Sequence, residues 1–147
     1  MQFKLNFELV PEGCWNSNLR TILSKKQWDY IKQLAKQNAN HQCAICGKKS
    51  SRLEAHERWV YDIESSTQKL VGIIAVCKDC HSVIHIGRTQ LVGNIERAEK
   101  HYMMVNNCTY SDFRRELGKA NELHQLLNRV EEWKLDISYL KEFLNLY

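Results

Sequence analysis

Two Cys-x-x-Cys pairs constrain this chain more than any other feature of its sequence. Cys43 and Cys46 form the first pair, Cys77 and Cys80 form the second, and thirty residues separate them. Four thiolates satisfy the tetrahedral preference of Zn²⁺ without a histidine ligand. Gly47 follows the first pair, where a glycine relieves the backbone just past the second sulfur. The spacing therefore predicts one structural zinc ion on the four cysteines, and it disfavours the alternative of buried or redox-active thiols.

The rest of the composition fits a soluble cytoplasmic protein. The N-terminus lacks the apolar segment of a signal peptide, and the longest apolar run, residues 73–77, is far too short to span a bilayer. Paired cysteines in a reducing compartment usually bind metal rather than form disulfides. We expect the two remaining cysteines, Cys14 and Cys108, to be ordinary buried thiols.

Hydrophobic periodicity places elements on both sides of the first cysteine pair. Residues 3–9 alternate apolar and polar side chains, which predicts a half-buried strand. Ser24 and Gln27 have the spacing of a capping box and predict a helix to about residue 39. Between the pairs, 52–61 and 68–76 are expected to form two strands joined by a turn.

The second cysteine pair is expected to open a helix, and more helices should follow it. The first should run from about Cys77 to Ile86 and end at Gly87. A short helix over 95–105 and a longer amphipathic one capped by Ser111 are expected next, and the closing segment should be a strand or a docked helix. An exposed stripe on these helices would support a homodimer, whereas packing on the core leaves a monomer.

These elements predict an α+β fold in three parts. Residues 1–40 would form an N-terminal strand and helix, 41–92 a zinc-stapled core, and 93–147 a C-terminal helical extension. His101 and His124 lie on the C-terminal helices and are expected to be solvated.

Three histidines in the core form a second group of possible metal ligands. His81 and His85 are four residues apart, so they share one face of the predicted helix, beside the face that carries the cysteines. His56 lies on the strand expected to pack across from this helix. The alternative is that His81 only packs against the zinc site and that His85 is a surface residue.

Residues from Cys43 to Arg88 resemble the HNH endonuclease family. The likeness rests on a Cys-x-x-Cys pair, the segment Leu53-Glu-Ala-His56, a strand, and a final Cys-x-x-Cys-His-x-x-x-His. The resemblance implies a zinc-binding ββα-metal core, which is treble-clef-like, and a metal-dependent nuclease that hydrolyses phosphodiester bonds in DNA. It also implies a bacterial or phage origin.

Carried over from the family, His56, His81 and His85 would hold a catalytic divalent ion. The ion would stabilise charge on the leaving 3′ oxygen while a base activates water. An all-imidazole site favours Zn²⁺, Ni²⁺, Mn²⁺ or Co²⁺ over Mg²⁺, which prefers oxygen ligands, although Mg²⁺ stays among the candidates.

The chain departs from the family pattern at two positions. Glu57 stands where the family has its histidine base, and no asparagine replaces the family's middle residue near Gly72. Glu57 can be a base, a fourth metal ligand, or a structural residue at a silent site. In an alternative alignment with the family pattern, His56 is the base and Glu54 or Glu57 binds the metal. The alternative function is a catalytically silent, zinc-stabilised module that binds nucleic acid or inhibits a protein.

Basic residues of the core are candidates for nucleic-acid contact. The net charge of +4 permits a polyanionic partner without requiring one. Arg58 and Arg88 should flank the histidines, and an ordinary solvated surface is the alternative. The full candidate set is Lys48, Lys49, Arg52, Arg58, Lys69 and Arg88.

Overall fold

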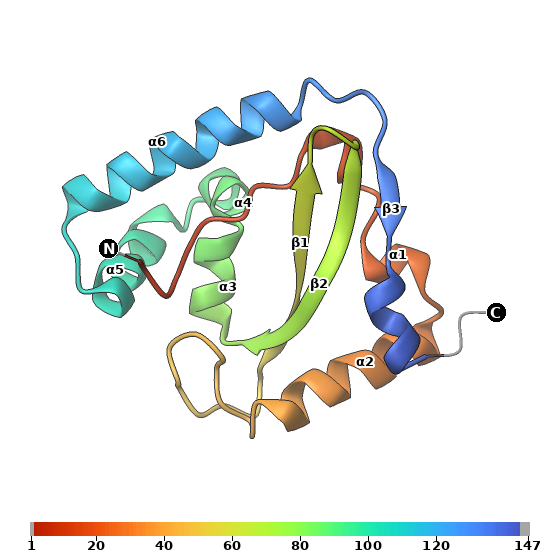
Figure 1. The fold of residues 1–147 in the computed structure, drawn as a ribbon. Coiled ribbons are helices and arrows are strands. Elements are labelled where there is room, and N and C mark those ends of the chain that lie inside the picture. Colours follow the sequence, from red (N-terminus) through yellow and green to blue (C-terminus); the bar gives the residue numbers. More distant parts are fainter. Residues whose placement is uncertain (1, 145–147) are drawn as a thin grey trace.

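The computed structural model describes residues 2–144 and shows, over that range, an α+β fold with a three-stranded sheet and six α-helices (Figure 1). The helices are α1 (Leu19–Ile22), α2 (Lys25–Asn38), α3 (Lys78–Ile84), α4 (Ile86–Val92), α5 (Ile95–Asn106) and α6 (Tyr110–Leu127). The strands are β1 (Glu54–Asp62), β2 (Thr67–Val76) and β3 (Lys134–Asp136), and two 3₁₀-helices are η1 (Glu12–Cys14) and η2 (Ser138–Glu142).

The two long strands form an antiparallel hairpin at the centre of the molecule (Figure 1). Glu54 pairs with Val76 at one end and Asp62 with Thr67 at the other, and the register shifts between Arg58 and Trp59. The short β3 pairs with β2 in parallel, so β1 is an outer strand. Both predicted strands are confirmed within two residues of their expected ends.

Helices cover both faces of the hairpin, and each face has its own buried cluster. In Figure 1, α3, α4, α5 and α6 lie on one side, while α1, α2 and η2 lie on the other. The first cluster includes Val83, Tyr102 and Phe113, and the second includes Trp28 and Leu140. Burial of these large apolar side chains against the hairpin fixes the position of α3, which carries two of the candidate ligands.

Capping chemistry predicted the start of α2 correctly. The Ser24 side chain accepts a hydrogen bond from the backbone N–H of Gln27, and the Gln27 side chain accepts one from the N–H of Ser24. This reciprocal pair satisfies two backbone donors that the first turn would otherwise leave unpaired.

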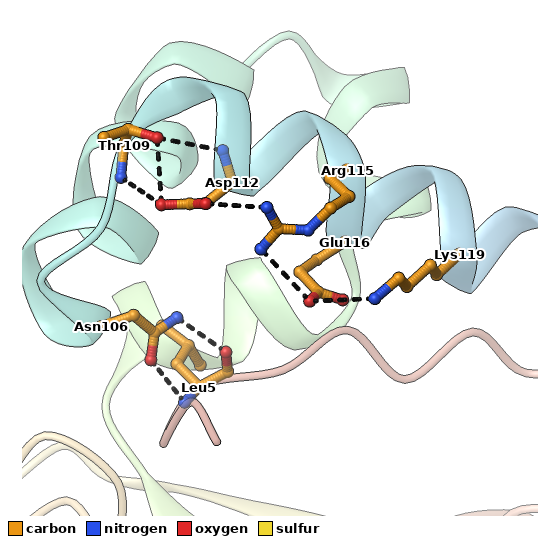
Figure 2. Close-up of polar contacts among 7 residues, drawn as sticks. All are labelled: Leu5, Asn106, Thr109, Asp112, Arg115, Glu116 and Lys119. Atoms are coloured by element: carbon orange, nitrogen blue, oxygen red, sulfur yellow. Dashed lines mark hydrogen bonds and ion pairs between the residues drawn. The ribbon is translucent and has the colours of Figure 1, made fainter. Parts of the chain in front are cut away.

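The predicted N-terminal strand over residues 3–9 is wrong. The segment bends at Lys4 and Leu5 and joins no sheet of the described residues, because its backbone groups bond to helices instead. The Asn106 side chain donates to the carbonyl of Leu5 at 2.9 Å and accepts from its N–H at 3.0 Å (Figure 2). Further along, the N–H of Glu8 donates to the carbonyl of Ile84 at 2.9 Å. The alternation of apolar and polar residues in this segment thus belongs to an anchored coil rather than to a strand.

The predicted helix over residues 77–86 also ends differently. α3 stops at Ile84, and His85 adopts φ −97° and ψ 53° before α4 begins. Thr89 stabilises this corner because its hydroxyl donates to the carbonyls of Ser82 and His85 at 2.6 and 3.2 Å. Gly87 therefore lies inside α4 rather than capping α3.

The C-terminal part contains α5 and α6 as expected, with a different cap for α6. Thr109, not Ser111, is the N-cap, and Thr109 and Asp112 form a capping box (Figure 2). The closing segment contains both predicted alternatives in short form, β3 and then η2. Over residues 2–144, no helix combines the length and apolar character needed to cross a membrane.

Candidate metal centres

The four paired cysteines meet at the junction of the hairpin and α3. Their sulfur atoms all lie within 4.8 Å of one another, so the cluster can hold a metal ion such as zinc. Cys43 and Cys46 come from the loop after α2, Cys77 follows β2, and Cys80 lies in α3. Gly47 has φ +79°, which confirms the expected need for a glycine past the second sulfur.

Backbone amides prepare the sulfur atoms for negative charge. The Cys43 sulfur accepts hydrogen bonds from the N–H groups of Ile45 and Cys46 at 3.4 and 3.5 Å. The Cys77 sulfur caps α3 by accepting from the N–H of Cys80 at 3.4 Å. Such N–H···S bonds stabilise thiolates, which are the form that binds metal.

Proximity gives the thiols very different acidities. A hydrogen bond from Cys80, helped by backbone amides, lowers the pKa of Cys43 to about 4. The same contact with Cys43, together with burial, raises the pKa of Cys80, and burial raises the pKa of Cys77 to about 11. Because the four sulfur atoms lie close together, four thiolates at this site need a cation to balance their charge.

His101 contacts the cysteine cluster, contrary to the expectation that it is solvated. Its Nε2 lies 3.2 Å from the sulfur of Cys80. Burial lowers the pKa of His101, which favours a neutral ring. His124 is also engaged, since its Nε2 lies 3.1 Å from the carbonyl oxygen of Val10.

The three predicted histidines form a second cluster. One nitrogen of each ring lies within 4.8 Å of one nitrogen of the others, and the ring centroids are 4.8 to 5.4 Å apart. His56 comes from β1, His81 from α3, and His85 from the corner between α3 and α4. The hairpin and helix therefore bring together ligands that are far apart in the chain.

The surroundings favour neutral imidazoles at this cluster. Burial lowers the pKa of His81 despite the opposing effect of Glu54, and burial plus the neighbouring His81 and His56 lowers the pKa of His85 to about 4. Neutral imidazole is the metal-binding form. Nδ1 of His81 lies 2.9 Å from Oε1 of Glu54, so Nε2 of His81 is left for an ion.

Glu8 is a neighbour of this cluster that the sequence did not reveal. Its Oε2 lies 3.0 Å from Nε2 of His56, off the direction that a hydrogen bond from this nitrogen requires. The buried Nε2 of His56 consequently has no hydrogen-bond partner within residues 2–144. Although burial would raise the pKa of Glu8, contact with His56 and the charge of Arg58 hold it below its usual value. The histidine cluster thus has a carboxylate beside it.

Glu57 lies outside the mutually close ligand group among the described residues. Neighbouring residues of a strand face opposite sides of the sheet, which separates Glu57 from His56. One oxygen of the Glu57 carboxylate accepts a hydrogen bond from the N–H of Leu19, the first residue of α1. Burial raises the pKa of Glu57 although this bond and nearby charges oppose the shift. Glu54 is likewise outside the group and contacts His81 instead.

Two cavities meet at the histidines. The first, of about 430 Å³, includes Glu8, Glu57 and three tryptophans in its walls, and the second, of about 570 Å³, extends toward α2 and Lys78. Arg88 lines both cavities, as expected for a residue that flanks the site. The other predicted contact residues line neither of them; these are Lys48, Lys49, Arg52, Arg58 and Lys69.

Comparison of the chain with models of known protein families, with curated proteins and with solved structures gave no match.

Proposed function

We propose that the chain is a metal-dependent endonuclease of the HNH type that hydrolyses phosphodiester bonds in DNA. The observation that carries this proposal is the convergence of His56, His81 and His85 within 4.8 Å of one another. The order of elements agrees with it, because an antiparallel hairpin leads into a helix beside a four-cysteine cluster. The cysteines would hold a structural zinc ion that fixes the hairpin against α3.

The three imidazoles would hold one divalent ion, which would supply charge stabilisation at the scissile phosphate and the leaving 3′ oxygen. Glu54 would orient His81 through the Nδ1 contact. Glu57 would accept the proton of the attacking water as the bond between phosphorus and the 3′ oxygen breaks. Glu57 lines the same cavity as the three histidines, and its raised pKa supports this base role.

The second candidate is a catalytically silent module that binds nucleic acid. It is favoured by the contact between Glu57 and the N–H of Leu19, which gives the carboxylate a structural partner at the start of α1. A carboxylate that mainly caps a helix does not need to take a proton. The two candidates share both metal centres and differ in what Glu57 does.

Cleavage of supercoiled plasmid with Mn²⁺, Ni²⁺ or Mg²⁺ tests the nuclease directly. We expect nicking by the wild-type chain and its loss in His56→Ala and in His85→Ala, with His41→Ala as a control because His41 is exposed and outside both clusters. Nicking that persists in both active-site variants rejects the assignment.

Glu57→His separates the two candidates. Faster cleavage by this variant would indicate a working metal site with a weak base. The silent module is supported if neither form cleaves and both bind DNA in a salt-dependent manner.

A further inference from the structure

The charged side chains that line the second cavity at the histidine cluster are mostly basic. Of the residues that the structure describes, five basic side chains contribute to its wall and only one acidic side chain does. The acid is Glu54, which already contacts His81. The basic residues are Arg20, Lys32, Lys36, Lys78 and Arg88.

These cations come from both sides of the outer strand β1. Lys32 and Lys36 are four residues apart and so share one face of α2, and Arg20 lies in α1. Lys78 and Arg88 come from α3 and α4 on the opposite face of the hairpin. Leu53 and the first two residues of β1, Glu54 and Ala55, line the cavity between these two walls.

Most of this charge is available to a ligand. Within residues 2–144, only Lys32 among the five has an ion-pair partner, Asp29 at 3.2 Å. Arg20, Lys78 and Arg88 are exposed, and Lys36 is partly exposed. Cations without a counter-ion on a concave surface attract an anion.

The cavity also leads into the histidine cluster. His81, His85, Arg20 and Arg88 line both this cavity and the first one, so the cationic wall and the imidazoles border a continuous surface. A polyanion lying along the wall would place a neighbouring phosphate at the three imidazoles.

We propose that this cavity, the α2 groove, binds the sugar–phosphate backbone of the nucleic acid on one side of the scissile bond. The inference rests on the proposed function for its ligand class and adds the path that the strand follows. Phosphate contacts of this kind position a substrate without reading its sequence. Lys48 and Lys49, at the first cysteine pair, lie outside this path.

Two matched double variants test the groove. Lys32→Gln with Lys36→Gln removes two charges from it, and Lys48→Gln with Lys49→Gln removes the same charge elsewhere. Both are made in a His85→Ala background to prevent cleavage. Zinc content and far-ultraviolet circular dichroism verify that each variant is folded. Binding of fluorescein-labelled duplex and single-stranded oligonucleotides is measured by anisotropy between 50 and 300 mM KCl.

Loss of two phosphate contacts should lower the slope of log affinity against log salt by about 1.8 for duplex DNA and weaken binding about 60-fold at 0.1 M salt. We expect this change for the double variant of Lys32 and Lys36. For the double variant of Lys48 and Lys49, the DNA affinity should fall less than about threefold. Equal losses of DNA affinity in the two double variants, or no DNA binding by the His85→Ala protein, would overturn the proposal for the groove. Displacement of DNA by polyglutamate at equal charge concentration would also overturn it, in favour of an acidic protein partner.

Failure of the proposed function gives a different result. If the wild-type chain never cleaves but the Lys32 and Lys36 pair selectively loses binding, the groove stands and the nuclease does not.

Discussion

Nε2 of His56 lies 3.0 Å from Oε2 of Glu8, which joins the N-terminal segment to the outer strand of the sheet. The contact does not follow the hydrogen-bonding direction of the ring nitrogen, so Nε2 of His56 has no hydrogen-bond partner among residues 2–144 although the residue is only 3% exposed. A buried imidazole nitrogen without a partner, with a carboxylate to one side, suits a shared cation better than a simple ion pair.

Glu8→Gln should weaken binding of the second divalent ion. The substitution keeps the shape of the side chain but removes the negative charge beside the three imidazoles, and a loss of about 10- to 100-fold in affinity is expected for a supporting carboxylate. Titration of zinc-loaded protein with Co²⁺, followed by visible absorption, measures the affinity.

Glu12→Gln is the matched control, because Glu12 is exposed and borders neither cavity. Equal Co²⁺ affinities for the two variants would show that Glu8 does not support the site.

Asn106→Ala should release the segment that carries Glu8. The substitution leaves the buried N–H and carbonyl of Leu5 without the side-chain partners that Asn106 provides (Figure 2). A cost of about 2 kcal/mol in unfolding free energy is expected, measured by urea denaturation. Co²⁺ affinity at the histidine cluster should fall as well, because Glu8 loses its fixed position.

Asn38→Ala, at an exposed position near the end of α2, serves as the comparison. If the Asn106 variant is destabilised but binds Co²⁺ normally, the anchoring of Leu5 by Asn106 does not support metal binding at the histidine cluster.

Cys46→Ser should abolish stoichiometric zinc binding at the cysteine cluster. Three thiolates hold the ion far more weakly than four, and binding energy at such sites is folding energy. We expect less than one zinc per chain by mass spectrometry of metals and a melting temperature at least about 10 °C lower.

Cys108→Ser should keep its zinc, because Cys108 is outside the cluster. Full zinc content in the Cys46 variant would show that the four cysteines do not form the structural zinc site.

His101→Leu should lower zinc affinity while leaving the four ligands in place. The variant removes a ring nitrogen that lies 3.2 Å from the Cys80 sulfur and that would donate to this sulfur in its zinc-bound thiolate form. Competition with a chromophoric chelator should show about a 10-fold loss or more. His41→Leu, at an exposed position, should behave like wild type; a loss of the same size there would indicate a general effect of removing a histidine.

The cysteine and histidine clusters could be predicted because their spacing is local and chemically specific. The two Cys-x-x-Cys pairs, the first followed by Gly47, indicate tight turns. The four-residue spacing of His81 and His85 places both side chains on one face of a helix. The strand that carries His56 was also identifiable from its periodicity, so the three ring nitrogens could be expected to meet.

Contacts set by packing could not be predicted in the same way. The period of residues 3–9 resembles a strand, but the bonds of Leu5 to Asn106 depend on where α5 lies. Glu8 shares no motif with His56 and reaches it only through that anchored segment. The cations of the α2 groove come from four helices, so no stretch of sequence shows them side by side.

Cys77 ends one element and begins another, since it follows β2 directly and caps α3 through its sulfur. An ion bound there would fasten the strand pair that holds His56 to α3, which holds His81 and leads into the corner that holds His85. Under the proposed function, zinc at the cysteines would hold the three imidazoles in the arrangement that receives the second ion. The proposed nuclease would therefore depend on zinc at the cysteine cluster even when the second metal is plentiful.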